Sequence, residues 1–144
     1  MTDPSAILAL AETYARAVWE KDQELFLSIY DDKLLAYDTW DSWSIEGRRR
    51  WGDMASEWFG SLQKERVRAV IVPERIDISG DMALLAGALT FTAISPDDRE
   101  LRSITSRLTW SLRQGPSGWT ITHEHGSAPV DFADHKADFT GPGS

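Results

Sequence analysis

Two histidines near the end of the chain have the side chains and the spacing best suited to acid–base or ligand chemistry. His123 and His125 lie in the segment 119–127, where apolar and polar residues alternate. Because the side chains of a strand point alternately to its two faces, both imidazoles are expected on the apolar face with Ile121, and Glu124 on the opposite face. A buried polar group without a partner is costly. The pair is therefore either two hydrogen-bonded core histidines or part of the wall of a pocket.

An aspartate on a second predicted strand is the next candidate. Over Leu34–Trp40 the same alternation places Leu34, Ala36, Asp38 and Trp40 on one face. A carboxylate between apolar neighbours and a tryptophan is unusual, because burial disfavours its charged form. Asp38 is thus either a turn-forming or capping acid near the end of the strand, or a group that faces a pocket.

Aromatic residues supply the third feature. Tyr14 lies on the apolar face of the first predicted helix, so its hydroxyl is either a structural tie or a donor into a pocket. Seven tryptophans are more than one small core readily absorbs, and some are expected to line a cavity or an interface. They are Trp19, Trp40, Trp43, Trp51, Trp58, Trp110 and Trp119.

The elements that would position these residues run from helices to strands. Asp3-Pro4 is typical of a helix start, with Asp3 as the cap and Pro4 at the first helical position. Pro73 predicts a bend or bulge in the first long strand. After the first helix we expect a short helix from Asp22 to about Tyr30, a strand at Leu34–Trp40, a helix from about Arg48 to Leu62, and strands at Val67–Ile78, Met82–Ile94, Leu101–Arg113 and 119–127.

Helices followed by a run of strands indicate an α+β fold with a strand meander. Three helices cannot cover both faces of such a sheet, so a curved sheet wrapped around the helices, with a cavity between them, fits the abundance of aromatic residues. One domain is expected over residues 1–130 of the 144. The polar segment 131–144 is expected to be a loose tail, or to pack on a partner chain through Phe132 and Phe139.

Composition excludes several classes of function. The net charge of −8 argues against nucleic acid, which proteins hold mainly with Lys and Arg. The chain has no cysteine, hence no disulfide, thiol nucleophile or thiolate metal site. No run approaches the roughly 18 apolar residues of a membrane span, and the N-terminus lacks the pattern of a signal peptide. A location in the cytoplasm is therefore expected.

The element order and the closing pattern Trp119-x-Ile-x-His-x-His-x-Ser127 resemble the SnoaL-like and ketosteroid-isomerase-like branch of the nuclear transport factor 2 (NTF2-like) superfamily, over about residues 5–130. The resemblance implies a cone-shaped fold, in which a strongly curved mixed β-sheet wraps around three helices and encloses a deep apolar pocket. It also implies a homodimer formed through the outer face of the sheet, and chemistry without a metal or cofactor.

Ketosteroid isomerases carry a catalytic aspartate on the first strand, ahead of a loop that ends in glycine, and Asp38 and Gly47 match both with the same spacing. Tyr14 falls at the place of the tyrosine that donates to the developing enolate. By this resemblance Asp38, its pKa raised by desolvation, would remove a proton next to a carbonyl group. Tyr14 would stabilise the charge that develops on the oxygen.

The second oxyanion donor of the isomerases, a protonated aspartate, aligns near Arg107, with one residue of uncertainty. An arginine there would favour an anionic or enolate-like ligand, and by pairing with Asp38 it would lower the pKa of that carboxyl. Epoxide hydrolases of limonene type, which share the fold, use an Asp-Arg-Asp set that Asp38 and Arg107 imitate in part. His123 and His125 have no counterpart among the catalytic residues of the isomerases.

The sequence leaves two main functions open. The first is a cofactor-independent enzyme that isomerises, cyclises or carries out aldol-type chemistry on a small apolar carbonyl compound. Asp38 would be the base, Tyr14 and Arg107 the oxyanion donors, and His123 or His125 the acid or the group that orients Asp38 or the substrate.

The second is a small-ligand-binding or dimerisation module with the same pocket and no chemistry. A metal site of both histidines and Asp38 is a third alternative. The expected substrate-binding residues are Trp40, Trp43, Trp58, Trp110 and Tyr30.

Overall fold

The computed structural model describes residues 3–143, so residues 1–2 and 144, the outermost positions of the predicted domain and tail, lie outside the described residues. Within this range none of the helices is long and apolar enough to cross a membrane. The helices are α1 (Ser5–Glu20), α2 (Gln23–Leu27) and α3 (Arg48–Ser61), and the strands are β1 (Tyr30–Tyr37), β2 (Ile45–Glu46), β3 (Arg66–Ser79), β4 (Met82–Ile94), β5 (Glu100–Gly115) and β6 (Gly118–Ser127).

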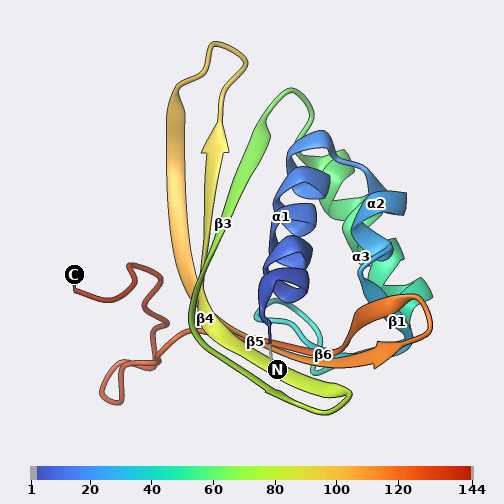
Figure 1. Ribbon diagram of the computed structural model, residues 1–144. Coiled ribbons are helices and arrows are strands. Elements are labelled where there is room, and N and C mark those ends of the chain that lie inside the picture. The colour runs from blue at the N-terminus through green and yellow to red at the C-terminus, as the bar shows by residue number, and fades with distance from the viewer. Residues whose placement is uncertain (1–2, 144) are drawn as a thin grey trace.

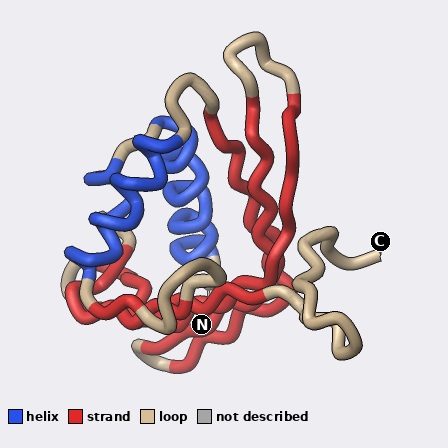
Figure 2. The backbone as a smooth tube through the Cα atoms, turned by 180° about the vertical axis from the view of Figure 1, so that it is seen from behind, coloured by secondary structure: helices blue, strands red, loops and turns tan. Residues whose placement is uncertain are grey.

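The six strands form one mixed sheet in the order β2-β1-β6-β5-β4-β3. β1 and β6 run parallel, and all other neighbouring strands run antiparallel. The sheet curves strongly along β3, β4 and β5, and all three helices lie on its concave side (Figure 1). The view from behind shows the same arrangement (Figure 2). The predicted α+β fold, a curved mixed sheet around three helices, is confirmed.

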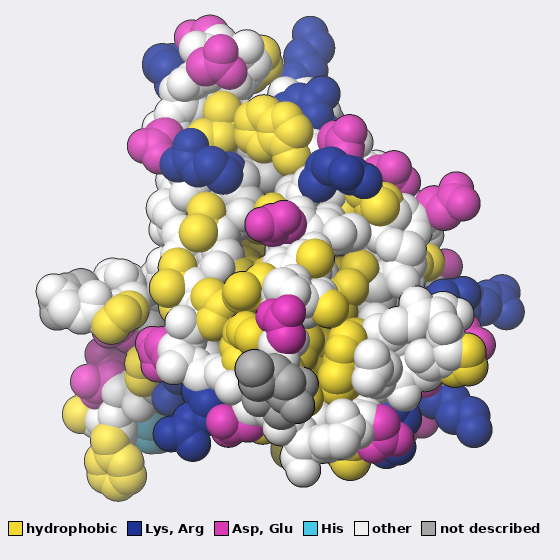
Figure 3. Space-filling model, in the orientation of Figure 1, with side chains coloured by type: hydrophobic (Ala, Val, Ile, Leu, Met, Phe, Trp, Pro, Cys, Tyr) yellow, Lys and Arg dark blue, Asp and Glu magenta, His cyan; other side chains and the backbone are white. Residues whose placement is uncertain are grey.

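One apolar face holds each long helix against the sheet. In α1 the buried residues Ile7, Tyr14 and Val18 recur at intervals of seven and four, and in α3 Ala55 and Phe59 are four apart, as one face of a helix requires. Burial of each large apolar side chain stabilises the fold by about 2 kcal/mol. In Figure 3 apolar side chains gather in the middle of the face shown, and charged ones lie mostly around it. The buried residues of the helices and strands form one apolar cluster between the helices and the sheet.

The bend of the sheet includes a bulge in β3. The pairing of β3 with β4 shifts register between Pro73 and Arg75, and Pro73 faces Gly87. A proline has no N–H to give to a strand ladder and is tolerated at a bulge. A Cβ on Gly87 would lie 2.3 Å from the carbonyl oxygen of Val72, so glycine lets the two strands approach closely here. The bulge predicted at Pro73 is confirmed.

The segment after β6 runs on the side of the sheet away from the helices (Figures 1 and 2). An isolated bridge joins Val130 to Ala137, and the Phe132 side chain is 96% exposed. Phe139 is half-buried, and its ring stacks on that of Trp40 in the same chain. In this structure the tail therefore packs on its own domain through Phe139.

Candidate functional site

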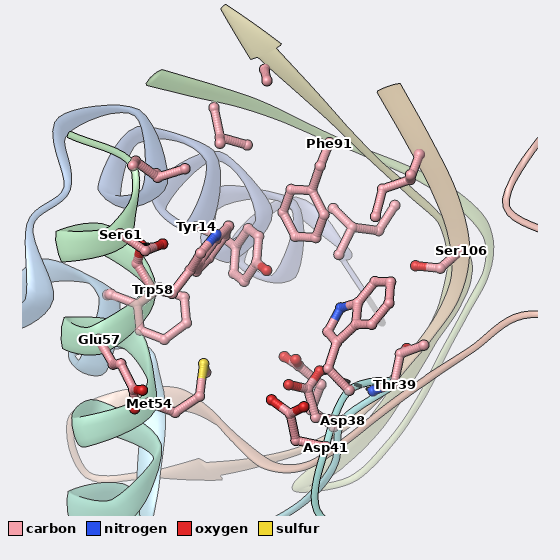
Figure 4. Close-up of a pocket in the computed structure, with 18 of the residues that line it drawn as sticks. Tyr14, Asp38, Thr39, Asp41, Met54, Glu57, Trp58, Ser61, Phe91 and Ser106 are labelled. Carbon is pink, nitrogen blue, oxygen red and sulfur yellow. Dashed lines mark hydrogen bonds between the residues drawn. The ribbon is translucent and has the colours of Figure 1, made fainter. Parts of the chain in front are cut away.

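A cavity of about 570 Å³ lies between α1, α3 and the concave face of the sheet. Its volume falls within the range of pockets that bind small molecules. Figure 4 shows the Tyr14 and Asp38 side chains entering it from opposite sides, with Trp58 and Phe91 forming part of the wall. The apolar lining includes Phe26, Met54, Trp58, Val67, Leu89 and Phe91.

Asp38 brings the first carboxyl group to this cavity. It follows directly after β1, two positions beyond the buried Ala36, and so continues the inner face of that strand. Its Oδ1 accepts a hydrogen bond of 3.0 Å from the backbone N–H of Thr39. Burial raises the pKa of Asp38, the Thr39 bond opposes that rise, and the nearby charge of Asp41 adds to it. A carboxylate with a raised pKa is a stronger base than a free aspartate.

Glu124, on β6, brings the second carboxyl group. It is 6% exposed, and its Oε1 accepts hydrogen bonds from the Tyr30 hydroxyl at 2.6 Å and from Nε1–H of Trp110 at 2.8 Å. Burial raises the pKa of Glu124 from 4.5 to about 7; these two bonds oppose the rise and the charge of Asp38 adds to it. Because both donors bind Oε1, the proton of the neutral acid belongs on Oε2. With a pKa of about 7, Glu124 changes its protonation state near neutral pH.

Tyr14 brings a hydroxyl group to the same space. Burial raises the pKa of Tyr14 well above 10, and the negative charges of Glu124 and Asp38 raise it further. The phenol therefore stays neutral and can donate a hydrogen bond. Within residues 3–143 no hydrogen bond is found for its hydroxyl, and Figure 4 shows the side chain pointing into the cavity. A ligand oxygen placed there would supply the acceptor.

The predicted orientation of β6 is wrong: Glu124, not the two histidines, reaches the cavity. Leu112 of β5 pairs with Ile121, and the preceding β5 residue pairs with His123, which leaves Thr122 as an extra residue in β6. Such a β-bulge shifts the alternation of side chains by one position for the rest of the strand. Ile121 and Glu124 consequently both point inward, although they are three positions apart.

His123 and His125 lie on the outer face of the sheet beside Tyr37. Both imidazoles meet the Tyr37 ring edge to face, with centroids 5.0 and 5.3 Å from it. Nδ1–H of His123 donates to the carbonyl oxygen of Leu35 at 2.6 Å, so this imidazole is tied to the backbone. The acid role predicted for the histidines therefore has no support in the geometry of the cavity.

The outward position of the histidines also separates them from Asp38. The three side chains of the metal alternative thus do not converge. Among residues 3–143 no group of three or more His, Cys, Asp and Glu side chains is arranged to hold a metal ion.

Arg107 also lies outside the cavity, contrary to the prediction. The buried Leu108 and Trp110 define the inner positions of β5, so Ser106 faces the cavity and Arg107 faces out. Nε–H of the exposed Arg107 donates to Oγ of Ser127 at 3.1 Å. Among residues 3–143 no ion pair joins Asp38 to an arginine, and Arg102, which also lines the cavity, pairs with Glu65. The Asp-Arg pair of the epoxide hydrolase alternative is therefore not assembled.

Two of the five predicted substrate-binding residues line the cavity, namely Trp40 and Trp58. Trp43 is 93% exposed and lies outside it. Tyr30 and Trp110 are completely buried, where they hold Glu124 by hydrogen bonds rather than forming the cavity wall. Their part in the site is to fix the carboxyl group, which the sequence alone does not indicate.

Comparisons with known proteins agree with the fold. The family model described as a SnoaL-like domain matches residues 7–131. A solved NTF2-like protein of unknown function from Pseudomonas putida KT2440 is 25% identical, with a TM-score of 0.77, covering 94% of this chain and 93% of that chain. A protein of unknown function from Mycobacterium tuberculosis is 18% identical, with a TM-score of 0.74 and coverage of 92% and 80%.

A third solved structure, an NTF2-like protein with a cystatin-like fold from Novosphingobium aromaticivorans, is 16% identical, with a TM-score of 0.73 and coverage of 86% of this chain and 80% of that chain. The search of curated proteins found no match. Because the family model spans most of the chain, the protein belongs to the SnoaL-like domain family, within the NTF2-like superfamily.

Proposed function

We propose that this protein is a cofactor-independent enzyme that transfers protons on a small apolar carbonyl compound. The observation that carries the proposal is that two carboxyl groups, Asp38 and Glu124, line one apolar cavity in different environments. Groups whose surroundings separate their pKa values can act as base and acid at the same pH. Near pH 6 Glu124, with its pKa of about 7, is mostly protonated. Burial also raises the pKa of Asp38, but the hydrogen bond from the backbone N–H of Thr39 stabilises its charged form.

The reaction that this arrangement supports begins at the carbon next to the carbonyl group. The Asp38 carboxylate takes a proton from that carbon, the C–H electron pair becomes a C=C bond, and the negative charge moves to the carbonyl oxygen. The Tyr14 hydroxyl and the Oε2–H of neutral Glu124 donate hydrogen bonds to this oxygen, where such a donor is worth about 10²–10³ in rate. Return of the proton from Asp38 to another carbon completes an isomerisation. In a cyclisation or an aldol reaction the enolate carbon instead attacks a second carbonyl carbon, the π electrons of that carbonyl group move to its oxygen, and the proton held by Asp38 passes to the alkoxide so formed.

A non-catalytic ligand-binding domain is the second candidate. It is favoured by the largely apolar lining and by the two hydrogen bonds that hold Glu124, since satisfied buried carboxyls also serve purely structural roles. In that case the cavity would bind neutral and enolate-like ligands of one shape equally well, because shape and apolar area alone would set the affinity.

The two candidates differ in a titration of the cavity at pH 6 with 2-tetralone, a neutral bicyclic ketone, and with 2-naphthols of graded acidity, which imitate its enolate. The enzyme proposal predicts that naphthols bind about tenfold or more tightly than the ketone, and that affinity grows as the phenol pKa falls. Tyr14→Phe should flatten this trend, because one oxyanion donor is removed. Isothermal titration calorimetry measures both, and equal binding of ketone and naphthols would favour the binding domain.

The homodimer and the cytoplasmic location stay predictions. On the outer face of β3 the side chains of Val70 and Val72 are exposed, which is compatible with a contact between two copies.

A further inference from the structure

Part of the cavity wall belongs to the connection between β1 and β2, a segment with few contacts to the rest of the protein. Trp40 lines the cavity, and it belongs to the connection between β1 and β2. Within residues 3–143, the stretch 40–44 takes part in no hydrogen bond, and Trp43 extends into solvent. The ring contact found for this stretch is the stack of Trp40 on Phe139, with centroids 5.1 Å apart and planes at 21°.

The partner in that stack is held much more firmly. The carbonyl oxygen of Phe139 accepts a hydrogen bond of 2.8 Å from the backbone N–H of Thr105, at the part of β5 that extends past the end of β6. The neighbouring Asp138 gives its backbone N–H to Pro129 at 2.8 Å and accepts two bonds from Thr140 through Oδ1. The backbone around Phe139 is thus tied to the sheet and to its own segment, whereas Trp40 is tied to Phe139.

We propose that the C-terminal segment acts as a latch, in which Phe139 positions Trp40 as a wall of the cavity and so sets how long a ring-bearing apolar ligand stays bound. Phe139 does not line the cavity, so it is a positioning residue and acts through Trp40. The inference uses the same cavity as the proposed function, but it requires only that the cavity binds a ligand. It assigns a role to a segment that the sequence predicts to be a loose tail.

The first test needs no ligand. With 5-fluorotryptophan in place of tryptophan, the ¹⁹F NMR signal of Trp40 can be identified by its loss in Trp40→Phe. The Phe139 ring shifts the Trp40 signal because aromatic rings perturb the magnetic field near their faces. In Phe139→Ala the Trp40 signal should move toward the position of the exposed Trp43 and become narrower. Phe139→Tyr, which keeps the ring, should retain the wild-type signal.

The second test measures the ligand. In stopped-flow displacement, 2-naphthol should dissociate about tenfold faster from Phe139→Ala than from the wild type. Loss of the aromatic pair between Phe139 and Trp40 removes an interaction of about that factor in the dissociation rate. For α-proton exchange of 2-tetralone the same variant should raise KM several-fold and leave kcat almost unchanged. Phe132→Ala is the matched control, because Phe132 lies on the same segment and is almost fully exposed; it should change none of these quantities.

The latch is overturned if Phe139→Ala leaves both the Trp40 signal and the naphthol dissociation rate at their wild-type values, or if Phe132→Ala changes them equally. If Phe139→Ala folds poorly, Phe139→Leu replaces it, because leucine keeps the apolar contact but has no ring. In Phe139→Leu the Trp40 signal must also move toward the position of the exposed Trp43. These results do not depend on Asp38. The two proposals can therefore fail separately. The protein can show turnover although Phe139→Ala has no effect on Trp40 or on ligand dissociation, or it can show the effect of Phe139→Ala without any turnover.

Discussion

Asp38→Asn is expected to lower the rate of α-proton exchange of 2-tetralone by about 10²–10⁴, the usual contribution of a positioned general base. Asparagine has nearly the shape of aspartate, and its amide oxygen can still accept the hydrogen bond from Thr39, but it cannot take up a proton. The affinity for 2-naphthol should therefore change only a few-fold. Hydrogen–deuterium exchange at the ketone, followed by ¹H NMR in D₂O, measures the rate directly.

Three variants control for this loss. Asp41 lines the same cavity but is exposed, so Asp41→Asn should keep the exchange rate within a few-fold. His123→Gln and His125→Gln should leave the rate unchanged, because both side chains lie on the outer face. Survival of exchange in Asp38→Asn would exclude Asp38 as the base, and its loss in either histidine variant would contradict the placement of the site. A wild-type protein that exchanges no such ketone would favour the ligand-binding domain.

Glu124 is expected to make the folded protein less stable as the pH rises from 5 to 8. Its pKa is about 7 in the folded protein and 4.5 ordinarily, so between these values the folded state binds more protons than the unfolded state. Stability then falls as pH rises through this window, and the loss is complete above pH 7. The difference corresponds to about 3 kcal/mol of unfolding free energy, and the raised pKa of Asp38 acts in the same direction.

The measurement is urea unfolding of the wild type and of Glu124→Gln at pH 5 and pH 8. Glutamine is neutral at both values, and its amide oxygen can accept the hydrogen bonds from Tyr30 and Trp110, so the variant should lose most of this pH dependence. Comparing the two proteins cancels the general effect of the net charge of −8, which both share apart from this site. Identical pH dependence in the two proteins would show that Glu124 titrates normally.

The sequence predicted the framework because its signals are periodic and local. Tyr14 was placed by the apolar face of a helix, and Asp38 by the alternation of a strand that reaches the cavity without interruption. Pro73 likewise predicted a bulge, since a proline has no N–H to give to the ladder. In each case one residue type carries a strong conformational preference.

The sequence does not predict the inner face of β6, because no residue with a strong conformational preference indicates the bulge in that strand. The bulge at Thr122 involves neither proline nor glycine, and it exchanges the faces of Glu124 and the histidines. Strict alternation places His123 on the same face as the apolar Ile121, so periodicity alone predicts the wrong face for His123 and Glu124. Arg107 differs, because the buried Leu108 and Trp110 one and three residues later indicate that it points outward. At this position the alternation of β5 indicates the correct face, whereas the alignment to the isomerases indicates the wrong one.

The central claim is that the cavity holds two carboxyl groups with separate pKa values, and a direct titration tests it. In protein labelled with ¹³C at the carboxyl carbons of Asp and Glu, the chemical shift of each group can be followed by NMR from pH 3 to pH 9. We predict one glutamate signal that titrates near pH 7 and is absent in Glu124→Gln, and an aspartate signal, absent in Asp38→Asn, that titrates above the ordinary aspartate value. Titration of every glutamate near its ordinary pKa would contradict the account, because Glu124 would then be a carboxylate throughout the neutral range and could not serve as the acid.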